Sequence, residues 1–249
     1  MTEELAGRLA ALAEKYETAD FLRGDPSWFM HQVEGDSNRE LVAFAASCLS
    51  YGSRKQFFPK IQYLLDCSGG DFAGWLSSGR YAADVPPSGR CYYRLHTYAH
   101  MHALLAGMAE VVAAHGSLGA YARAGSSDAL SAVALFCRGF GQSTPLVPSN
   151  PKSACKRLCM FLRWMSRSGS PVDLGLWAGF IDRRTLIMPL DTHVVGEAAA
   201  MGLLRSKAAS MPAALKLTDE MRKVFPDDPL KGDFALFGLG VDTEENKNR

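Results

Sequence analysis

The stretch that decides the fold runs from Leu146 to Met165 and reads LVPSNPKSACKRLCMFLRWM. A turn of proline and polar residues at 147–151 precedes a run whose apolar residues recur every three or four positions. This period is typical of an amphipathic helix, which we predict over 153–165. Its apolar stripe comprises Leu158, Phe161, Leu162 and Met165, and a second face carries Lys156, Met160, Arg163 and Arg167.

The same period continues outward from this helix in both directions, and strand-like alternation is hard to find. The predicted helices cover 3–16, 39–51, 56–65, 97–115, 127–140, 153–165, 192–204, 212–224 and 231–239. Asp36 or Ser37 can cap the second helix, Gly116 can end the fourth and Gly169 follows the sixth. The charged tail, 242–249, is expected to fray. The fold class is therefore all-α, with about nine to eleven helices.

Composition limits the classes of function. The 249 residues are 47% hydrophobic with a formal net charge of +1, so a nucleic-acid-binding protein of this kind needs a local basic face. No run approaches about 18 apolar residues, and the N-terminus lacks the basic start of a signal peptide, so we expect no membrane role. None of the six cysteines forms a C-x-x-C pair, which argues against a disulfide framework, zinc or an iron–sulfur cluster.

Lys156 is the first candidate for chemistry, because it stands in the first turn of the predicted helix. The positive end of the helix dipole disfavours an ammonium there. Together with Arg157, that field should lower the pKa of the lysine and raise its nucleophilic fraction. The alternative is a basic, solvated helix face that at most touches phosphates.

Asp191 lies where the apolar segment 187–190 gives way to a helix, in IMPLDTHVV. Aspartate is a favoured N-cap, so its carboxylate can accept the amide of His193 or Val194. A capping carboxylate stays ionised, and capping is therefore compatible with catalysis. His193 is predicted to be a polar contact near the same site, with no warrant for a metal.

A third candidate lies in FPDDPLKGDFALFGLG, residues 225–240. Asp233 and Phe237 are spaced i, i+4 and share a helix face, where an acceptor and a ring could read and stack on a purine. The alternative is a core aromatic beside an acidic helix start.

Taken together, these segments resemble the helix-hairpin-helix DNA glycosylase superfamily. The chain is more closely similar to a family of uncharacterised bacterial proteins, itself similar to archaeal 8-oxoguanine DNA glycosylases, through SACKRLCMFLRWM, VDLGLW, PLDTHV and DPLKGDFALFGLG. The likeness covers about 25–241. It implies two closely joined helical subdomains with a helix-hairpin-helix element and a cleft between them. One would span about 30–140, and the catalytic one about 141–241, with the N-terminal helix packed on it.

The resemblance also implies roles for residues. Lys156 would be the nucleophile and Asp191 its assisting carboxylate. Lys152 is a rival nucleophile, because Lys152-Ser153-Ala154 is similar to the Lys-Thr-Ala of the wider superfamily; we prefer Lys156 because a cation, Arg163, follows two turns later. Substrate contacts would come from Met160, Arg163, Asp233, Phe237 and His193.

The implied activity is removal of 8-oxoguanine from double-stranded DNA by a lysine Schiff base, with β-lyase activity and no cofactor. The expected DNA contacts are Arg157, Arg167, Ser149, Asn150, Tyr51 and Ser53, with Tyr93 and Arg94 as further candidates and Arg163 and Lys207 as additional phosphate contacts. We expect a monomer in the bacterial cytoplasm, associated with the nucleoid when bound to DNA.

Two departures qualify the resemblance. Prolines interrupt the hairpin that is usually glycine-rich, and proline offers no amide to a phosphate; the cluster cysteines of some relatives are absent. Two other classes of protein stay open: a catalytically silent nucleic-acid-binding protein on the same scaffold, and a helical interaction protein. The enzyme requires Lys156, Asp191 and Asp233 to lie in one site, within about 12 Å.

Overall fold

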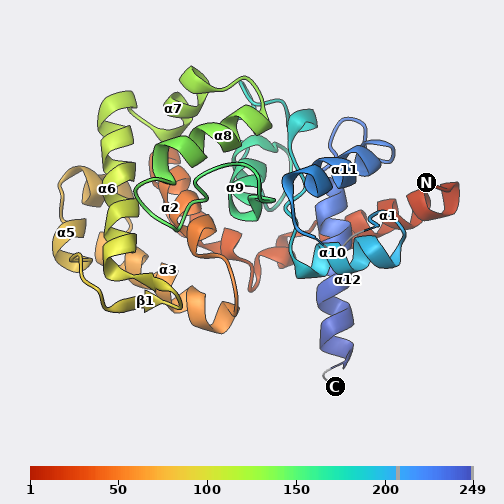
Figure 1. Cartoon of the computed structure of the whole chain (residues 1–249), viewed down its shortest axis with the longest axis horizontal. Coiled ribbons are helices and arrows are strands. Elements are labelled where there is room, and N and C mark those ends of the chain that lie inside the picture. The colour runs from red at the N-terminus through yellow and green to blue at the C-terminus, as the bar shows by residue number, and fades with distance from the viewer. Residues whose placement is uncertain (206–207, 248–249) are drawn as a thin grey trace. The chain divides into compact units, whose positions relative to one another are not determined.

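The computed structural model describes residues 1–205 and 208–247 (Figure 1). The described chain is mostly helical, which confirms the all-α class. Its named strands form one short antiparallel hairpin, β1 (Cys91–Tyr93) and β2 (His96–Thr97), which the sequence did not reveal. A strand of two or three residues is too short to show alternation.

The chain divides into two compact units. The first unit comprises Met1–Phe21, Asp128–Leu130 and Pro151–Arg249, and the second comprises Leu22–Ser127 and Ser131–Asn150. The segment 141–150, which the sequence assigned to the catalytic subdomain, belongs to the second unit.

The second unit is built around α2, whose residues from Glu40 to Leu49 are all buried. Its helices and short helical turns are η2 (Pro26–His31), α2 (Asp36–Leu49), α3 (Arg54–Ser68), α4 (Phe72–Ser77), α5 (Tyr81–Asp84), α6 (Tyr98–His115), α7 (Leu118–Gly125) and most of α8 (Ala129–Phe140). Phe44 of α2 packs on Phe136 and Phe140 of α8. The buried Glu40 carboxylate accepts the amides of Leu118 and Gly119 at 2.8 and 2.9 Å, so a core acid caps α7.

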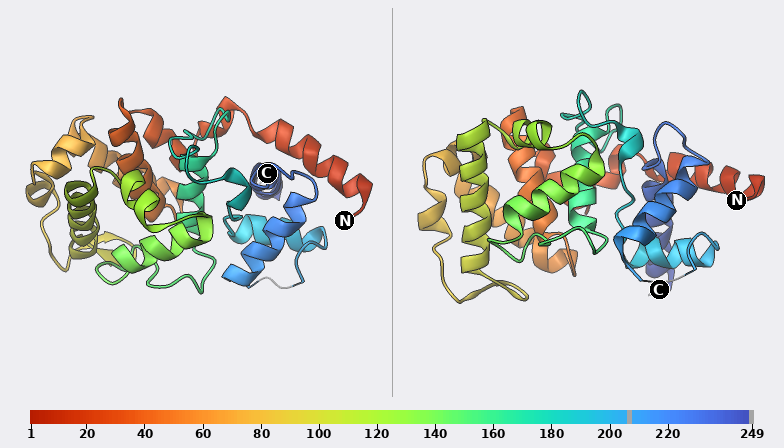
Figure 2. Two further views of the ribbon diagram at one scale, coloured as in Figure 1. Left: turned by 90° about the horizontal axis from the view of Figure 1, so that it is seen from above. Right: turned by 45° about the horizontal axis from the view of Figure 1, so that its top comes forward.

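The first unit joins the two ends of the chain. Its elements are α1 (Glu3–Tyr16), η1 (Ala19–Leu22, which ends one residue beyond the unit), α9 (Lys156–Ser166), η3 (Arg183–Thr185), α10 (Thr192–Ala200), α11 (Met211–Arg222) and α12 (Lys231–Lys247). Helix α12 packs against both α1 and α10, as Figures 1 and 2 show. Gly238 makes the α1 contact possible, because an added Cβ would collide with the ring of Tyr16.

Helix ends deviate most from the sequence-based prediction. Helix α1 has the predicted bounds, and Gly116 ends α6 as expected, with φ +88° and an amide donated to Val112. The predicted caps of α2 are wrong: Gly35 is its N-cap, and no side chain caps the helix. The tail prediction is wrong for 242–247, since α12 continues to Lys247 and Asp242 accepts hydrogen bonds from Lys15 and Tyr16; its last two residues, 248–249, lie outside the described residues.

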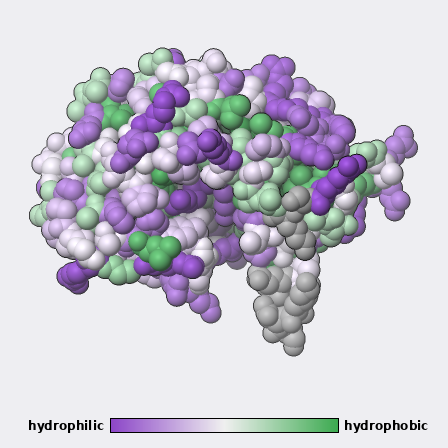
Figure 3. All heavy atoms as spheres, viewed as in Figure 1, coloured by the Kyte–Doolittle hydropathy of each residue, from purple (hydrophilic) through white to green (hydrophobic). Residues whose placement is uncertain are grey.

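One face of the molecule is seen in Figure 3. On the face seen in Figure 3, hydrophobic side chains form small patches among hydrophilic ones, as is usual for protein surfaces. Within the described ranges, no single helix is long and apolar enough to span a membrane. Helices α6 and α7 meet that criterion only as a pair bent by 70°.

Candidate active site

Lys156 opens α9, three residues later than the predicted helix start. The preceding Cys155 has a left-handed backbone, with φ 46°, and makes no side-chain cap, so the helix begins abruptly. The Lys156 side chain is 30% exposed, and its Nζ lies 3.3 Å from Oδ2 of Asp191, whose side chain is 12% exposed. Lys156 therefore forms a partly exposed ion pair with Asp191.

Asp191 uses its two oxygens differently. Oδ1 accepts the Val194 amide at 2.8 Å, and Asp191 is the N-cap of α10, which confirms the predicted capping role. Oδ2 faces Lys156. The cap therefore fixes the carboxylate while leaving one oxygen for the lysine, and the two roles coexist in one side chain.

Asp233 lies in the first turn of α12, buried and hydrogen-bonded to Arg163. Burial raises the pKa of Asp233 to about 6; Arg163 and Lys156 oppose that shift, and Asp191 adds to it. Because Lys156, Asp191 and Asp233 influence one another electrostatically, the three predicted groups belong to one charged cluster of the first unit.

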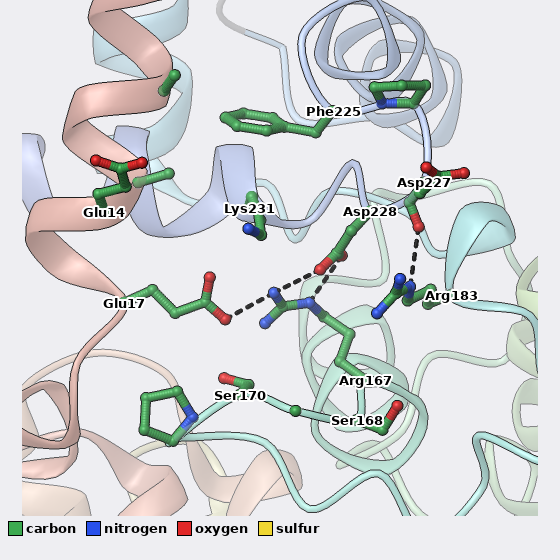
Figure 4. A pocket seen from close by; sticks show the side chains of 15 residues that line it. Glu14, Glu17, Arg167, Ser168, Ser170, Arg183, Phe225, Asp227, Asp228 and Lys231 are labelled. Atoms are coloured by element: carbon green, nitrogen blue, oxygen red, sulfur yellow. Dashed lines mark hydrogen bonds and ion pairs between the residues drawn. The ribbon is translucent and has the colours of Figure 1, made fainter.

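A buried ion-pair chain continues from Asp233 into the core. Arg163 donates to Asp233 and, at 3.2 Å, to Asp173. Asp173, whose side chain has no exposed area, also accepts from Arg167. Arg167 in turn donates to both oxygens of Asp228, at 2.9 and 2.8 Å, and to Glu17 at 2.7 Å (Figure 4). We call these six residues the buried ion network: Glu17, Arg163, Arg167, Asp173, Asp228 and Asp233.

The buried ion network corrects two expectations. Arg163 and Arg167 were expected to touch DNA phosphates, but they are only 3% and 2% exposed, and their guanidiniums hydrogen-bond to protein carboxylates. A phosphate contact from either residue would require breaking buried ion pairs. The alternative of a solvated basic face also fails for these two arginines, because α9 is buried from Leu158 to Ser166.

Aromatic rings line the same part of α12. Phe237 is half-buried, with its ring centroid 5.8 Å from His193 and 5.9 Å from Phe21. Phe21 also meets the buried Phe234 at 4.9 Å, and the Arg163 guanidinium lies over the Phe234 ring. Met160 is buried, 7% exposed, one turn after Lys156. The two predicted alternatives for this helix face coexist: Phe234 is core, while Phe237 stays partly accessible.

The remaining predicted residues are spread over the chain. Lys152 lies outside α9 and is exposed, whereas Arg157 is the second residue of α9 and half-buried. The exposed Ser149, Asn150 and Ser53 belong to the second unit. Lys207 lies outside the described residues.

Tyr51 also belongs to the second unit and packs on Tyr93, with ring centroids 4.9 Å apart. The Tyr93 hydroxyl donates to the Tyr51 carbonyl, and the Arg94 guanidinium lies over the Tyr51 ring. These three predicted residues therefore form one cluster.

Sequence reasoning missed Glu17, Phe21, Asp173 and Asp228 as members of this region. Asp173 and Asp228 stood within quoted motifs, VDLGLW and DPLKGDFALFGLG, but an isolated aspartate gives no sign of its partner. Glu17 and Phe21 are separated from α9 and α12 by most of the chain, so only the fold reveals them.

The arrangement supplies an amine, a fixed carboxylate within 3.3 Å, and a second, buried carboxylate. An amine beside a base is the arrangement of lysine nucleophiles. Across residues 1–205 and 208–247, no group of three or more His, Cys, Asp or Glu residues is arranged to hold a metal ion.

Comparisons with known proteins give one family. A family model described as "Protein of unknown function (DUF2400)" matches residues 25–242. Searches of curated proteins and of solved structures found no match.

Proposed function

We propose that this chain, which belongs to the DUF2400 family of unknown function, is a DNA glycosylase with AP lyase activity that removes an oxidised purine, 8-oxoguanine. The single observation that carries the proposal is the pairing of Lys156 with Asp191 at 3.3 Å, at the border of solvent. A partly exposed amine beside an ionised, helix-capping carboxylate supplies both a nucleophile and a stabilising charge.

The first step requires the damaged nucleotide to leave the base stack, because its C1′ is inaccessible within a duplex. Lys156 gives up its ammonium proton to solvent, and the Asp191 carboxylate keeps its negative charge and faces the positive charge that develops on the sugar. The neutral amine forms a bond to C1′ while the glycosidic bond breaks. The base departs with that electron pair and takes up a proton.

The second step uses the covalent intermediate. Opening of the sugar gives an iminium between Nζ of Lys156 and C1′. Loss of a proton from C2′ and cleavage of the C3′–O bond release the 3′ phosphate. Water then hydrolyses the imine and regenerates the amine, so the reaction balances without a cofactor.

Base selection would fall to Asp233 and Phe237. Arg163 fixes Asp233 from inside the protein, so we assign Arg163 a positioning role rather than direct contact. Phe237 is half-buried and offers a ring face to a purine. Met160, buried one turn from the nucleophile, would close the base pocket.

The hairpin would lie in the connection 141–155, and its second helix would be α9. DNA contacts would involve Arg157 in the first unit and Ser149, Asn150, Tyr51 and Ser53 in the second unit. The protein is proposed to act as a monomer in the bacterial cytoplasm, on the nucleoid.

The decisive test is borohydride trapping on a duplex carrying one 8-oxoguanine, because borohydride reduces the iminium to a stable adduct. Wild type and Lys152→Gln are expected to give the adduct, and Lys156→Gln to give none. Asp191→Asn should slow adduct formation by at least about 100-fold, since one preorganised charge is worth about that much or more.

Loss of the adduct in Lys152→Gln alone would assign the nucleophile to Lys152 instead. Absence of an adduct in wild type, across a panel of oxidised and alkylated bases, would reject the enzyme and favour a silent DNA-binding protein.

A further inference from the structure

We infer that a pocket at the C-terminal end of α9 binds a phosphate group. The pocket has a volume of about 390 Å³ and lies within the first unit. The lining residues that carry the argument are Ser166, Ser168, Gly179, Asp182, Arg183 and Arg184. Ser166, which lines the pocket, is ten residues after Lys156 in α9. At a rise of about 1.5 Å per residue, the two residues are about 15 Å apart along the helix. The pocket is therefore distinct from the candidate active site.

The charge of this pocket favours an anion. Two arginines and one aspartate leave one net positive charge. Asp182 is already neutralised, since it accepts hydrogen bonds from Nε and Nη2 of Arg184 at 2.8 and 2.6 Å. These bonds hold the pKa of Asp182 below its usual range, so its carboxylate is satisfied within the protein.

Arg183 supplies the open donors. Its Nε donates to the Asp227 carbonyl at 3.0 Å, which anchors the guanidinium beside Ser168 (Figure 4). Its terminal nitrogens have no partner in the described parts of the chain. An anchored guanidinium whose terminal N–H groups are open can donate to two oxygens of a phosphate.

Ser166 is the independent sign of a ligand. It is 1% exposed, it lines the pocket, and its Oγ has no hydrogen-bond partner among the described residues. A buried hydroxyl without a partner is unfavourable, and such groups in native proteins call for an explanation. A phosphate oxygen can accept a hydrogen bond from this hydroxyl.

The pocket also has room and further donors. Ser168 is exposed at its edge, and a Cβ added at Gly179 would meet nothing within 4 Å. The phosphate could be part of a DNA backbone or a free phosphate or phosphomonoester. Only the DNA source rests on the proposed function.

The test compares wild type with Arg183→Gln and Gly179→Asp, using Arg8→Gln as the matched control. Arg8 is an exposed arginine of the first unit outside the pocket. Calorimetry measures inorganic phosphate binding, and fluorescence anisotropy measures undamaged duplex binding over a series of salt concentrations. Thermal melting establishes whether each variant is folded. If one of the two pocket variants does not fold, the other still tests the pocket.

A free-phosphate site predicts stoichiometric phosphate binding that weakens at least about tenfold in both pocket variants, with duplex affinity unchanged. A DNA-backbone site predicts weaker duplex binding and a salt slope reduced by about 0.9, the value for one phosphate contact. Arg8→Gln should change neither measurement. Unchanged phosphate and duplex binding in both pocket variants would overturn the inference.

Neither readout needs a trapped adduct. Failure of the enzyme proposal and failure of the pocket are therefore distinguishable.

Discussion

The two ends of α9 carry the same kinds of charge in opposite environments. At its start, Lys156 meets Asp191 with 30% of the lysine side chain exposed. Toward its end, Arg163, the eighth residue of α9, and Arg167, the C-cap, lie in the buried ion network, where no side chain is more than 12% exposed. The comparison teaches that position along one helix separates a cation that meets solvent from cations that hold the fold together.

Removal of Asp173 should have the largest effect, because it leaves Arg163 and Arg167 without the carboxylate that joins them. We expect Asp173→Ala to lower the free energy of unfolding by about 3–5 kcal/mol, measured by urea denaturation. The control is Asp219→Ala, which breaks an exposed pair with Arg222 and should cost at most about 1 kcal/mol. Similar losses in both variants would show that burial does not set the strength of these pairs.

The pH dependence of stability tests Asp233, which hydrogen-bonds to Arg163 of the buried ion network and interacts electrostatically with Lys156 and Asp191. Folding raises the pKa of Asp233 from about 4 in an unfolded chain to about 6. Between these values the folded state holds a proton that the unfolded state has lost, so stability falls as the pH rises. Relative to Asp233→Asn, wild type should lose stability from about pH 4 to about pH 6 and then change no further.

Urea denaturation of both proteins across this range measures the difference. A constant difference, or one that grows in favour of wild type with rising pH, would contradict the assignment.

The smallest effect on stability is expected at the candidate nucleophile. Lys156→Gln should change the free energy of unfolding by at most about 1 kcal/mol, because a partly exposed pair contributes little. The same variant should lose the trapped adduct completely. A stability loss as large as that of Asp173→Ala would place Lys156 with the structural charges and undermine the comparison.

Sequence alone predicted what depends on local pattern. The helical class, the bounds of α1, the cap at Gly116 and the cap by Asp191 follow from period and capping residues within a few positions. The hairpin at Cys91–Thr97 and the short helices α4 and α5 were missed, because elements of two to six residues show no period.

The failures at Arg163 and Arg167 have a different cause. Their partners Asp173, Asp228 and Asp233 lie 6 to 70 positions away in the sequence, and no local pattern tells a solvated arginine from a buried one. The proximity of Lys156 to Asp191 was likewise not derivable from spacing; it entered through resemblance, and the geometry of the pair is the new observation.

The contact between α1 and α12 has a consequence for folding during synthesis. Lys15 and Asp242 bind each other across 227 positions of sequence, and Glu17 reaches Arg167 across 150. On the ribosome, the first helix must therefore wait until almost the whole chain has emerged before its partner exists. Closing so long a loop is entropically costly and slow. The second unit, drawn from residues 22–150, is free to fold in the meantime.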